Sequence, residues 1–298
     1  MNILSLFDGM SGARIALDRA GIKVDAYFAS EVDKYAIQVA QKNYPDIVHL
    51  GDVRNVTANE LPHIDLLIGG SPCQGFSFAG KQLNFNDPRS ALFFEYVRIL
   101  KEVKPTYFLL ENVKMSKRSE KVITDLLGVE PITINSALVS AQHRVRMYWT
   151  NIPDVGQPED KGILLTDIIE SGIVDREKSY CIDANYFKGG NLNRYFNKSS
   201  RQLVFGYSRK TGIQFDRGEL EKAVGVLASD WRGLNRNQRQ NCVVDFDSIT
   251  YRKLSPVEVE RLQTVKETYT DGVSNTQRYK MLGNGFTVDV IAHILRGI

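Results

Sequence analysis

The chain contains 298 residues, of which 43% are hydrophobic and 24% are charged, a composition that is ordinary for a globular protein. No apolar run approaches the roughly 20 residues of a membrane span, and the opening segment "NILSLF" is too short and too uncharged for a signal peptide, so we expect a cytoplasmic protein. The three cysteines (Cys73, Cys181 and Cys242) and four scattered histidines argue against a disulfide framework and against a bound metal.

The net charge of +3 conceals an uneven distribution of charge along the chain. Residues 1–150 carry 17 basic and 16 acidic side chains, a balance of +1. Residues 186–253 carry 13 basic and 6 acidic side chains, a balance of +7. A local basic excess indicates a polyanionic partner, although it is also compatible with a solvated, lysine-rich surface.

The first part of the chain alternates between strand-like and helix-like hydrophobic periodicity. The expected strands cover residues 2–7, 23–31, 46–50, 64–68 and 105–110. The expected helices cover residues 11–21, 33–44, 90–103 and 117–128. This alternation predicts an α/β fold with a mostly parallel sheet and helices on both of its faces.

The pattern changes after residue 130. Residues 131–140 and 143–151 both resemble strands, and the two residues between them leave no room for a crossover helix. We therefore expect an antiparallel hairpin at the edge of the sheet. Beyond it the periodicity fades, until a helix is expected over 255–265 and a glycine loop followed by an apolar helix over 281–295.

The turn "LFDGMSGA" joins the first expected strand to the first helix and contains Gly9 and Gly12. It is an incomplete dinucleotide fingerprint, but Glu31 ends the next strand 19 positions after Gly12, where a carboxylate can bond ribose hydroxyls. Asp52 follows the next strand and could accept from an adenine amine. A nucleoside cofactor is therefore expected, although acids at strand ends can also simply cap helices.

Three further motifs carry reactive side chains. Cys73 follows a buried strand and two glycines in "GGSPCQGFS", and Glu111 follows the neighbouring strand in "ENV". If residues 143–151 form a strand, Gln142, Arg144 and Arg146 lie on one face of it. A thiol beside an acid and two arginines indicates covalent catalysis with proton transfer. The alternatives are a packed cysteine, a helix cap and an edge strand protected by charge.

Taken in order, these motifs resemble those of the cytosine-5 DNA methyltransferases. "SLFDGMSG", "SPCQGFS", "ENV", "QHRVR", "LSPVEVERLQ" and "LGNGFTVDVI" match the family's motifs over nearly the whole chain. The first half is similar to the catalytic domains of animal de novo DNA methyltransferases. One departure is "GNGF", where many bacterial members have Gly-Asn-Ala-Val or Gly-Asn-Ser-Val. The cofactor contact of Phe286 is thus less well supported than that of Asn284.

The resemblance implies a Rossmann-like S-adenosylmethionine-dependent methyltransferase fold with an antiparallel edge hairpin and a small, irregular target-recognition domain. The catalytic, cofactor-binding domain is expected over 1–153 and 278–298, and the small domain with its hinge over 154–277. The implied activity is methylation of carbon 5 of cytosine in a specific double-stranded DNA sequence.

The same resemblance implies a role for each catalytic residue. Cys73 would add to carbon 6 of the cytosine as a thiolate. Glu111 would hold the ring at N3 and the amino group, and Arg144 and Arg146 would hold the base oxygen. The base must be flipped out of the duplex for this chemistry.

The cofactor contacts follow in the same way, whereas the DNA contacts within 186–240 are expected from the basic excess of that region. The residues implied to contact S-adenosylmethionine are Phe7, Asp8, Gly9, Met10, Ser11, Gly12, Glu31, Val32, Asp52, Val53, Pro72, Asn284, Gly285 and Phe286. The residues expected to contact DNA are Gln74, Ser77, Gln142, Lys188, Trp231, Arg232, Arg236 and Arg239. Sequence specificity is expected within 186–240, with the arginines as the better candidates for reading bases.

Three alternatives remain open at this stage: a transfer RNA cytosine-5 methyltransferase, a catalytically inactive DNA-binding regulator, and a Rossmann-type dehydrogenase. The long polar segment over 155–250 favours DNA over RNA, and the intact "FDGMSG", Cys73 and Glu111 argue against an inactive regulator. The incomplete glycine motif and the Pro-Cys and Glu111 pair argue against a dehydrogenase. A nucleoid-associated location in a prokaryotic or phage setting is expected, with a cognate restriction endonuclease as one conceivable partner.

Overall fold

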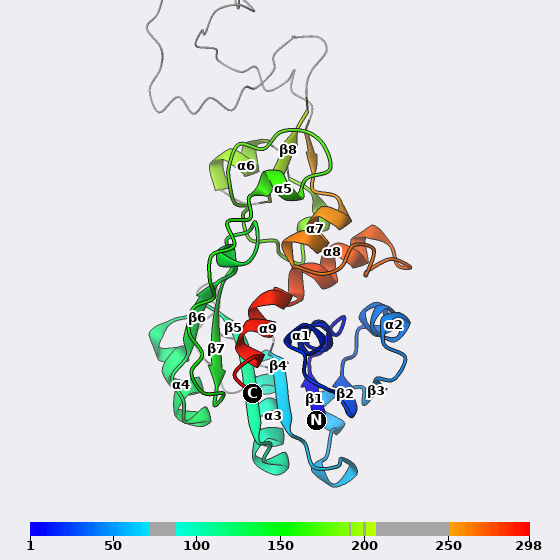
Figure 1. Cartoon of the computed structure of the whole chain (residues 1–298), viewed down its shortest axis with the longest axis vertical. Helices are drawn as coiled ribbons and strands as arrows, with labels where there is room; N and C mark the ends of the chain where they lie inside the picture. The colour runs from blue at the N-terminus through cyan, green and yellow to red at the C-terminus, as the bar shows by residue number, and fades with distance from the viewer. Residues whose placement is uncertain (72–87, 191, 199–200, 207–250) are drawn as a thin grey trace, which may run out of the picture.

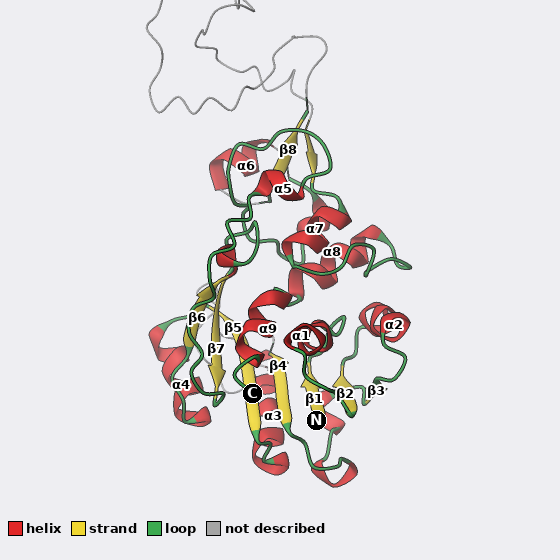
Figure 2. Cartoon of the chain, in the orientation of Figure 1, coloured by secondary structure: helices red, strands yellow, loops and turns green. Residues whose placement is uncertain are grey.

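The computed structural model describes residues 1–71, 88–190, 192–198, 201–206 and 251–298. Its centre is a seven-stranded sheet in the order β3-β2-β1-β4-β5-β7-β6 (Figures 1 and 2). The strands are β1 (Asn2–Leu6), β2 (Ala26–Ser30), β3 (Val48–His49), β4 (Leu66–Gly70), β5 (Tyr107–Val113), β6 (Ile132–Asn135) and β7 (Val145–Thr150). The first five are parallel, whereas β7 is antiparallel to both β5 and β6. The mostly parallel sheet with an antiparallel edge is therefore confirmed.

Helices cover both faces of this sheet, as the alternation predicted. The helices around it are α1 (Gly12–Ala20), α2 (Lys34–Asn43), α3 (Pro88–Val103), α4 (Lys117–Leu127) and α9 (Val288–Leu295). Successive strand residues point to opposite faces. Ile3 of β1 accordingly joins the buried cluster that contains α1, α2 and α9, and Leu4 joins the cluster that contains α3 and α4.

Local signals set the ends of these helices. The left-handed Gly21, with φ of 75°, closes α1. The Asp33 side chain accepts from the Tyr35 backbone N–H and begins α2, and the Ser116 side chain accepts from the Ser119 N–H and begins α4. Each cap satisfies a backbone group that would otherwise lack a partner at the helix end.

The expected hairpin strands over 131–140 and 143–151 are shorter than predicted. The Asn135 side-chain oxygen accepts from the Ala137 N–H at 3.1 Å and the Arg144 N–H at 3.0 Å, and it turns the chain into the short 3-10 helix η4 (Ser136–Leu138). Strand β7 consequently begins only at Val145. The expectation that Gln142, Arg144 and Arg146 share one strand face is therefore wrong.

A smaller, irregular part lies above the sheet in Figure 1. It contains α5 (Leu165–Ile168), η5 (Tyr186–Lys188), α6 (Leu192–Lys198) and the antiparallel pair β8 (Leu203–Phe205) and β9 (Tyr251–Lys253). The chain returns to the sheet through α7 (Pro256–Leu262) and α8 (Asn275–Asn284). The proposed boundary between residues 277 and 278 thus falls inside α8. Among the described residues, no helix combines the length and apolar character needed to cross a lipid bilayer.

Gly283 was expected in a glycine loop but lies in the last turn of α8. A Cβ atom there would come within 2.3 Å of the Asp183 carbonyl carbon and oxygen. The helix and the backbone of the smaller part therefore touch directly, and a side chain at this position must push them apart.

Gly283→Ala is expected to lower the free energy of unfolding by about 1–3 kcal/mol, the usual cost of overpacking. Alanine is normally favoured over glycine inside a helix by about 1 kcal/mol, so a loss identifies the clash as the cause. Urea denaturation of the variant gives the measurement. Gly156→Ala is the control, because a Cβ atom at Gly156 meets nothing within 4 Å. Equal stability of both variants with the unsubstituted chain would contradict this packing argument.

Candidate active site

The predicted functional residues gather at the carboxyl ends of the parallel strands. Phe7 follows β1, Glu31 follows β2, Ser71 follows β4, and Glu111 lies near the end of β5. Gly70 of β4 is in register with Glu111 of β5. Parallel strands direct their carboxyl ends to one edge of a sheet, and this edge is where open α/β sheets bind ligands.

The turn after β1 has an unusual backbone. Phe7, Gly9 and Ser11 have φ values of 56°, 60° and 62°, all in the left-handed region. Side chains other than glycine rarely adopt this conformation, and such strain clusters at binding sites. The Glu31 carboxylate holds the turn by accepting from the Gly9 N–H at 2.8 Å, and it also accepts from the Val32 N–H at 2.7 Å.

Asp8 lies beneath this turn and is only 5% exposed. Its carboxylate accepts from the Tyr27 hydroxyl at 2.6 Å and from the Ser11 hydroxyl. Burial raises the pKa of Asp8 from 3.8 to about 6, although the hydrogen bond from Ser11 partly opposes the shift. Asp8 is thus a structural support of the turn.

The raised pKa of Asp8 predicts a dependence of stability on pH. The folded protein favours the neutral form of Asp8. The free energy of unfolding therefore decreases as pH rises from 3.8 to about 6, where Asp8 must ionise. Asp8→Asn cannot ionise. The free energy of unfolding of the variant minus that of the unsubstituted chain should therefore become more positive by on the order of 2–3 kcal/mol between pH 4 and pH 7.

Chemical denaturation at several pH values tests this prediction, and Asp25→Asn is its control. The pKa of Asp25 is lowered by its hydrogen bond to the N-terminal amine, so Asp25 contributes stability above its unfolded pKa that is lost as pH falls. The relative stability of Asp25→Asn should therefore decrease with rising pH. A pH-independent difference for Asp8→Asn would mean that Asp8 does not titrate as described.

The turn and its neighbours fit an amphiphilic nucleoside. Val32, beside Glu31, is 70% exposed and offers an apolar surface to a purine. Phe286 is half-buried and packs against two glycines of the same edge: a Cβ atom on Gly12 would lie 3.7 Å from its ring, and one on Gly70 3.1 Å. The glycines thus let an aromatic ring approach the sheet closely.

The other predicted cofactor residues differ in accessibility. Asn284 is exposed and Gly285 is half-buried, but the side chains of Met10, Ser11 and Val53 are buried with that of Asp8. Those four residues could meet a ligand mainly through their backbones. Pro72 lies outside the described residues.

Asp52 already has a partner at this edge. It caps η1 (Val53–Asn55) and forms an ion pair with the exposed Arg54. The hydrogen bonds from the Arg54 side chain and backbone lower the pKa of Asp52 to about 2. The carboxylate is therefore ionised at neutral pH and able to accept a further donor.

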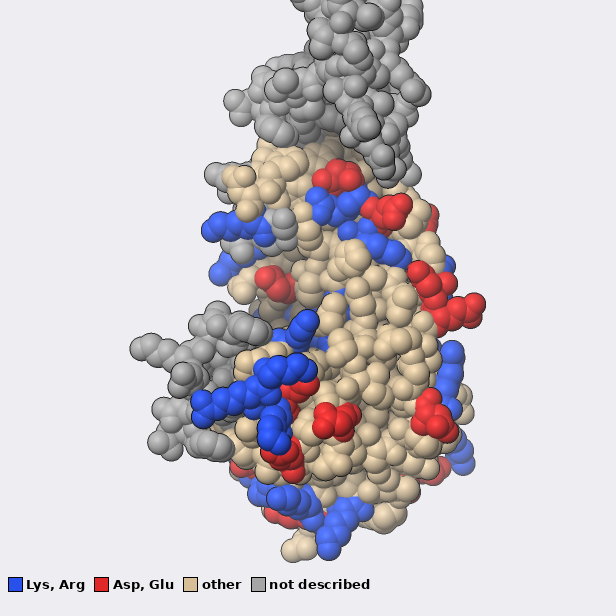
Figure 3. Space-filling model, turned by 90° about the vertical axis from the view of Figure 1, so that its left-hand side faces the viewer, with Lys and Arg blue, Asp and Glu red and all other residues tan. Residues whose placement is uncertain are grey.

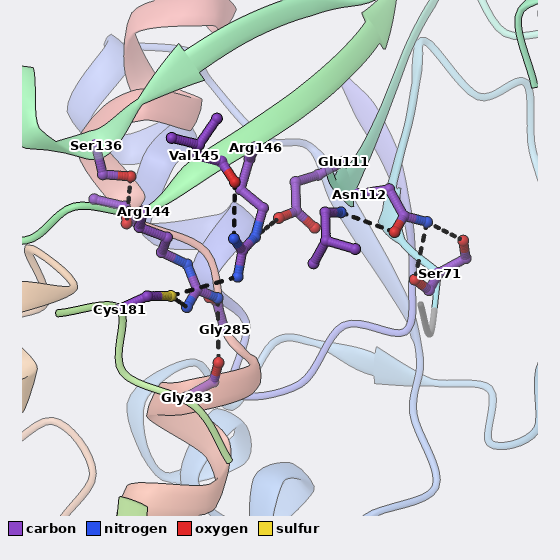
Figure 4. A network of polar contacts seen from close by, with 12 residues as sticks. Ser71, Glu111, Asn112, Ser136, Arg144, Val145, Arg146, Cys181, Gly283 and Gly285 are labelled. Atoms are coloured by element: carbon purple, nitrogen blue, oxygen red, sulfur yellow. Dashed lines mark hydrogen bonds and ion pairs between the residues drawn. The ribbon is translucent and has the colours of Figure 1, made fainter. Parts of the chain in front are cut away.

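Glu111 and Arg146 form the centre of the catalytic end (Figure 4). Arg146 Nε lies 2.9 Å from Glu111 Oε1, and both side chains are only 14% exposed. Burial lowers the pKa of Arg146, but the neighbouring Glu111 carboxylate outweighs it and raises that pKa overall. A Cβ atom on Gly70 would lie 3.0 Å from Glu111 Oε2, so glycine leaves room for this carboxylate.

Arg144 does not point to the same place as Arg146. It is 3% exposed, and it donates to the carbonyl oxygens of Ile182 at 2.9 Å, Gly283 at 3.1 Å and Gly285 at 2.9 Å (Figure 4). Both terminal nitrogens of Arg144 thus already donate to protein carbonyls, and its contact with the base oxygen stays a prediction. Arg144 ties the catalytic edge to the loop that carries Phe286.

Gln142 is also a structural residue. It is fully buried, and its amide nitrogen donates to the Leu262 carbonyl at 2.8 Å and to the Gln263 side chain at 3.0 Å. Protein groups therefore surround the Gln142 side chain in this structure, and its DNA contact stays a prediction. Lys188, by contrast, is exposed at the end of η5.

Two residues at this edge were missed by sequence reasoning. Asn112 is buried and donates to the Ser71 hydroxyl at 3.1 Å, which links the "ENV" strand to the residue that precedes Pro72 (Figure 4). Its position inside "ENV" was a signal that could have found it. Cys181 lies 3.4 Å from Arg144 Nη1 and 3.9 Å from Arg146 Nη2, and no local pattern indicates that contact.

Several predicted site residues lie outside the described residues. These are the expected nucleophile and the remaining expected DNA contacts: Cys73, Gln74, Ser77, Trp231, Arg232, Arg236 and Arg239. Within the described ranges, no group of three or more His, Cys, Asp or Glu side chains is arranged to hold a metal ion.

Comparison with known proteins gives a family and a set of relatives. The model of the C-5 cytosine-specific DNA methylase family matches residues 1–160 and 160–298. Type II methyltransferase M.FnuDI of Fusobacterium nucleatum is 42% identical over 332 residues, which cover 99% of this chain and 93% of the relative. Type II methyltransferase M1.ScrFI of Lactococcus lactis subsp. cremoris is 32% identical over 310 residues, which cover 97% of this chain and 75% of the relative.

Solved structures share the fold. The crystal structure of a variant of DNMT2 from Spodoptera frugiperda aligns with a TM-score of 0.70 at 20% identity and covers 99% of this chain and 98% of that one. A putative DNA modification methyltransferase encoded within an Escherichia coli prophage aligns with a TM-score of 0.64 at 19% identity, with coverages of 100% and 98%. The fold is thus the Rossmann-like fold of S-adenosylmethionine-dependent methyltransferases.

Proposed function

This chain belongs to the C-5 cytosine-specific DNA methylase family and is a DNA cytosine-5 methyltransferase, and from that premise we propose that it methylates a flipped-out cytosine within a specific duplex sequence through a covalent adduct with Cys73. The observation that carries the proposal is the Glu111–Arg146 pair at 2.9 Å, which joins β5 to β7. Strand β5 is the neighbour of β4, which ends at Gly70, and Pro72 and Cys73 follow Gly70 by two and three positions.

Cys73, Glu111 and Arg146 have different roles in the proposed reaction. Cytosine carbon 5 is a poor nucleophile, and addition of the Cys73 thiolate at carbon 6 converts the ring into an enamine whose carbon 5 is reactive. Glu111 holds N3 and the amino group and shares a proton with the ring, so that charge does not accumulate there. Arg146 donates to the base oxygen and orients the Glu111 carboxylate.

Arg144 and Asn112 are positioning residues in this proposal. Arg144 fixes the carbonyls of Gly283 and Gly285 beside the Phe286 loop, and Asn112 fixes Ser71 at the entrance to the Cys73 segment. S-adenosylmethionine, when bound, supplies the methyl group that carbon 5 takes up. Loss of the carbon-5 proton then expels Cys73 and restores the aromatic ring.

Glu31 and Asp52 are proposed to hold the nucleoside of the cofactor. Glu31→Ala and Asp52→Ala should each raise the dissociation constant of S-adenosylmethionine by about 10- to 100-fold, because each removes a charge-assisted hydrogen bond. Isothermal titration calorimetry measures the change, with the exposed Glu60→Ala as a control. Unaltered affinity in both variants would remove the basis for this assignment.

Sequence reading is proposed for residues 186–240, and a restriction–modification setting in a bacterium or phage is proposed from the relatives. Bisulfite sequencing of DNA from cells that express the chain tests the main proposal, because it reports both the methylated carbon and its sequence context. A defined methylated motif supports it. Methylation of transfer RNA with none on duplex DNA would overturn it in favour of the RNA alternative.

A further inference from the structure

The turn from β5 into α4 carries an unusual density of positive charge. Residues 114–121 read "KMSKRSEK" and include four basic side chains and one acidic one. We call Lys114, Lys117, Arg118 and Lys121 the basic turn. It lies outside the basic excess of residues 186–253 that the sequence suggested as the DNA-binding region.

The basic turn stands at the same edge of the sheet as the candidate active site. Strand β5 ends at Val113, two residues after Glu111, and α4 begins at Lys117. Lys114 is therefore the first residue beyond the carboxyl end of the strand that holds Glu111. Figure 3 looks onto the side of the molecule where β6 and α4 lie, and it shows Lys and Arg side chains left of the middle of this face, with Asp and Glu side chains beside and below them.

The basic side chains of this turn are not needed for packing. Helix α4 buries Ser119, Ile123 and Leu127 against the sheet, whereas Lys117 is 90% exposed and Lys121 is 75% exposed. These two lysines pair with Glu120 at 2.8 Å and Asp125 at 3.1 Å. Such exposed pairs contribute about 0–1 kcal/mol, so they do not account for the cluster.

Lys114 and Arg118 are exposed and have no acidic partner within the part of the chain that the structure describes. Positive charges in the first turn of a helix also oppose its dipole, so they reduce helix stability slightly. An unbalanced cluster that lowers stability, placed three residues from Glu111, is expected where a polyanion approaches the catalytic edge.

We propose that the basic turn binds backbone phosphates of double-stranded DNA beside the target cytosine, independently of sequence. The inference rests on the proposed function, because it assumes that the flipped base reaches Glu111 and Arg146. Contacts to phosphates position a protein on the duplex but carry no sequence information, and an exposed lysine meets a phosphate as a point charge. The basic turn therefore supplies affinity from the catalytic part, whereas residues 186–240 are left to supply specificity.

The test is a salt series on the double variant Lys114→Ala/Arg118→Ala. Binding of cognate and non-cognate duplexes is measured by fluorescence anisotropy without turnover. Each lost phosphate contact lowers the slope of log Kd against log salt concentration by about 0.9, so a decrease of about 1–2 is expected for both duplexes. The control, Lys23→Ala/Lys101→Ala, also removes two exposed positive charges. Because Lys23 precedes β2 and Lys101 lies in the last turn of α3, these two charges sit at the opposite edge of the sheet, and the slope should not change.

The inference would be overturned by a salt slope equal to that of the unsubstituted chain, or by an equal decrease of the slope in the control variant. A loss confined to the cognate duplex would also overturn it, since that pattern indicates base reading. Failure of the proposed function is distinguishable, because it appears in the unsubstituted chain as absence of 5-methylcytosine by bisulfite sequencing.

Discussion

Replacing Cys73 by alanine is expected to lower the rate of methyl transfer by about 10⁴-fold or more while leaving the affinity for S-adenosylmethionine nearly unchanged. In the proposed mechanism the sulfur attacks the base and takes no part in binding the cofactor, so its removal should affect only the reaction. Methyl transfer from labelled cofactor to duplex DNA measures the rate, and calorimetry measures the affinity. Cys73→Ser should be similarly inactive, because a hydroxyl is a far weaker nucleophile at neutral pH than a thiolate.

A trapping experiment makes the role of Cys73 specific. Duplex DNA with 5-fluorocytosine at the target position cannot lose fluorine from carbon 5, so a stable adduct should form with the unsubstituted chain. Cys181→Ala is the matched control, because Cys181 is a free, exposed thiol at the same edge. The adduct should survive Cys181→Ala and disappear in Cys73→Ala. Substantial turnover by Cys73→Ala would falsify the covalent mechanism.

Breaking the Glu111–Arg146 pair is expected to have the second largest effect. Glu111→Ala leaves the Arg146 cation 14% exposed and without its carboxylate, and removal of one partner of a buried pair costs about 3–5 kcal/mol of stability. Loss of the proton-sharing group should also slow methyl transfer by about 10²- to 10⁴-fold. Glu111→Gln keeps the shape and a hydrogen-bond acceptor, so it should retain more stability than Glu111→Ala but remain slow.

A double-mutant cycle measures the interaction energy between Glu111 and Arg146 separately from the effect of each side chain alone. Arg146→Ala and the combined Glu111→Ala/Arg146→Ala variant complete the cycle, with the free energy of unfolding and the single-turnover rate as the two measurements. We expect the double variant to be more stable than the sum of the single losses implies, because neither charge is then left buried alone. Strict additivity in both measurements would show that the two side chains act independently, contrary to the contact at 2.9 Å.

The sequence by itself determined the fold class and the family of this protein, through its hydrophobic pattern and the order of its motifs. The alternation of apolar residues along β1 sends Ile3 and Leu4 to opposite faces, and this short-range property predicted helices on both sides of a parallel sheet. The turn glycines and the caps at Asp33 and Ser116 are equally local. The order of the motifs was enough to indicate the family, because reactive residues follow strands whose carboxyl ends must share one edge.

Only the tertiary structure decided which polar side chains near that edge are buried against other parts of the chain. Gln142 and Arg144 look equivalent to Arg146 in the sequence, yet one hydrogen-bonding side chain, Asn135, ends the strand early and directs them into the protein. Arg144 then contacts carbonyls of Gly283 and Gly285, about 140 positions away in the chain. A polar side chain can be buried only where it finds hydrogen-bond partners, and here these partners lie far away in the sequence. Local hydrophobic periodicity therefore does not predict them.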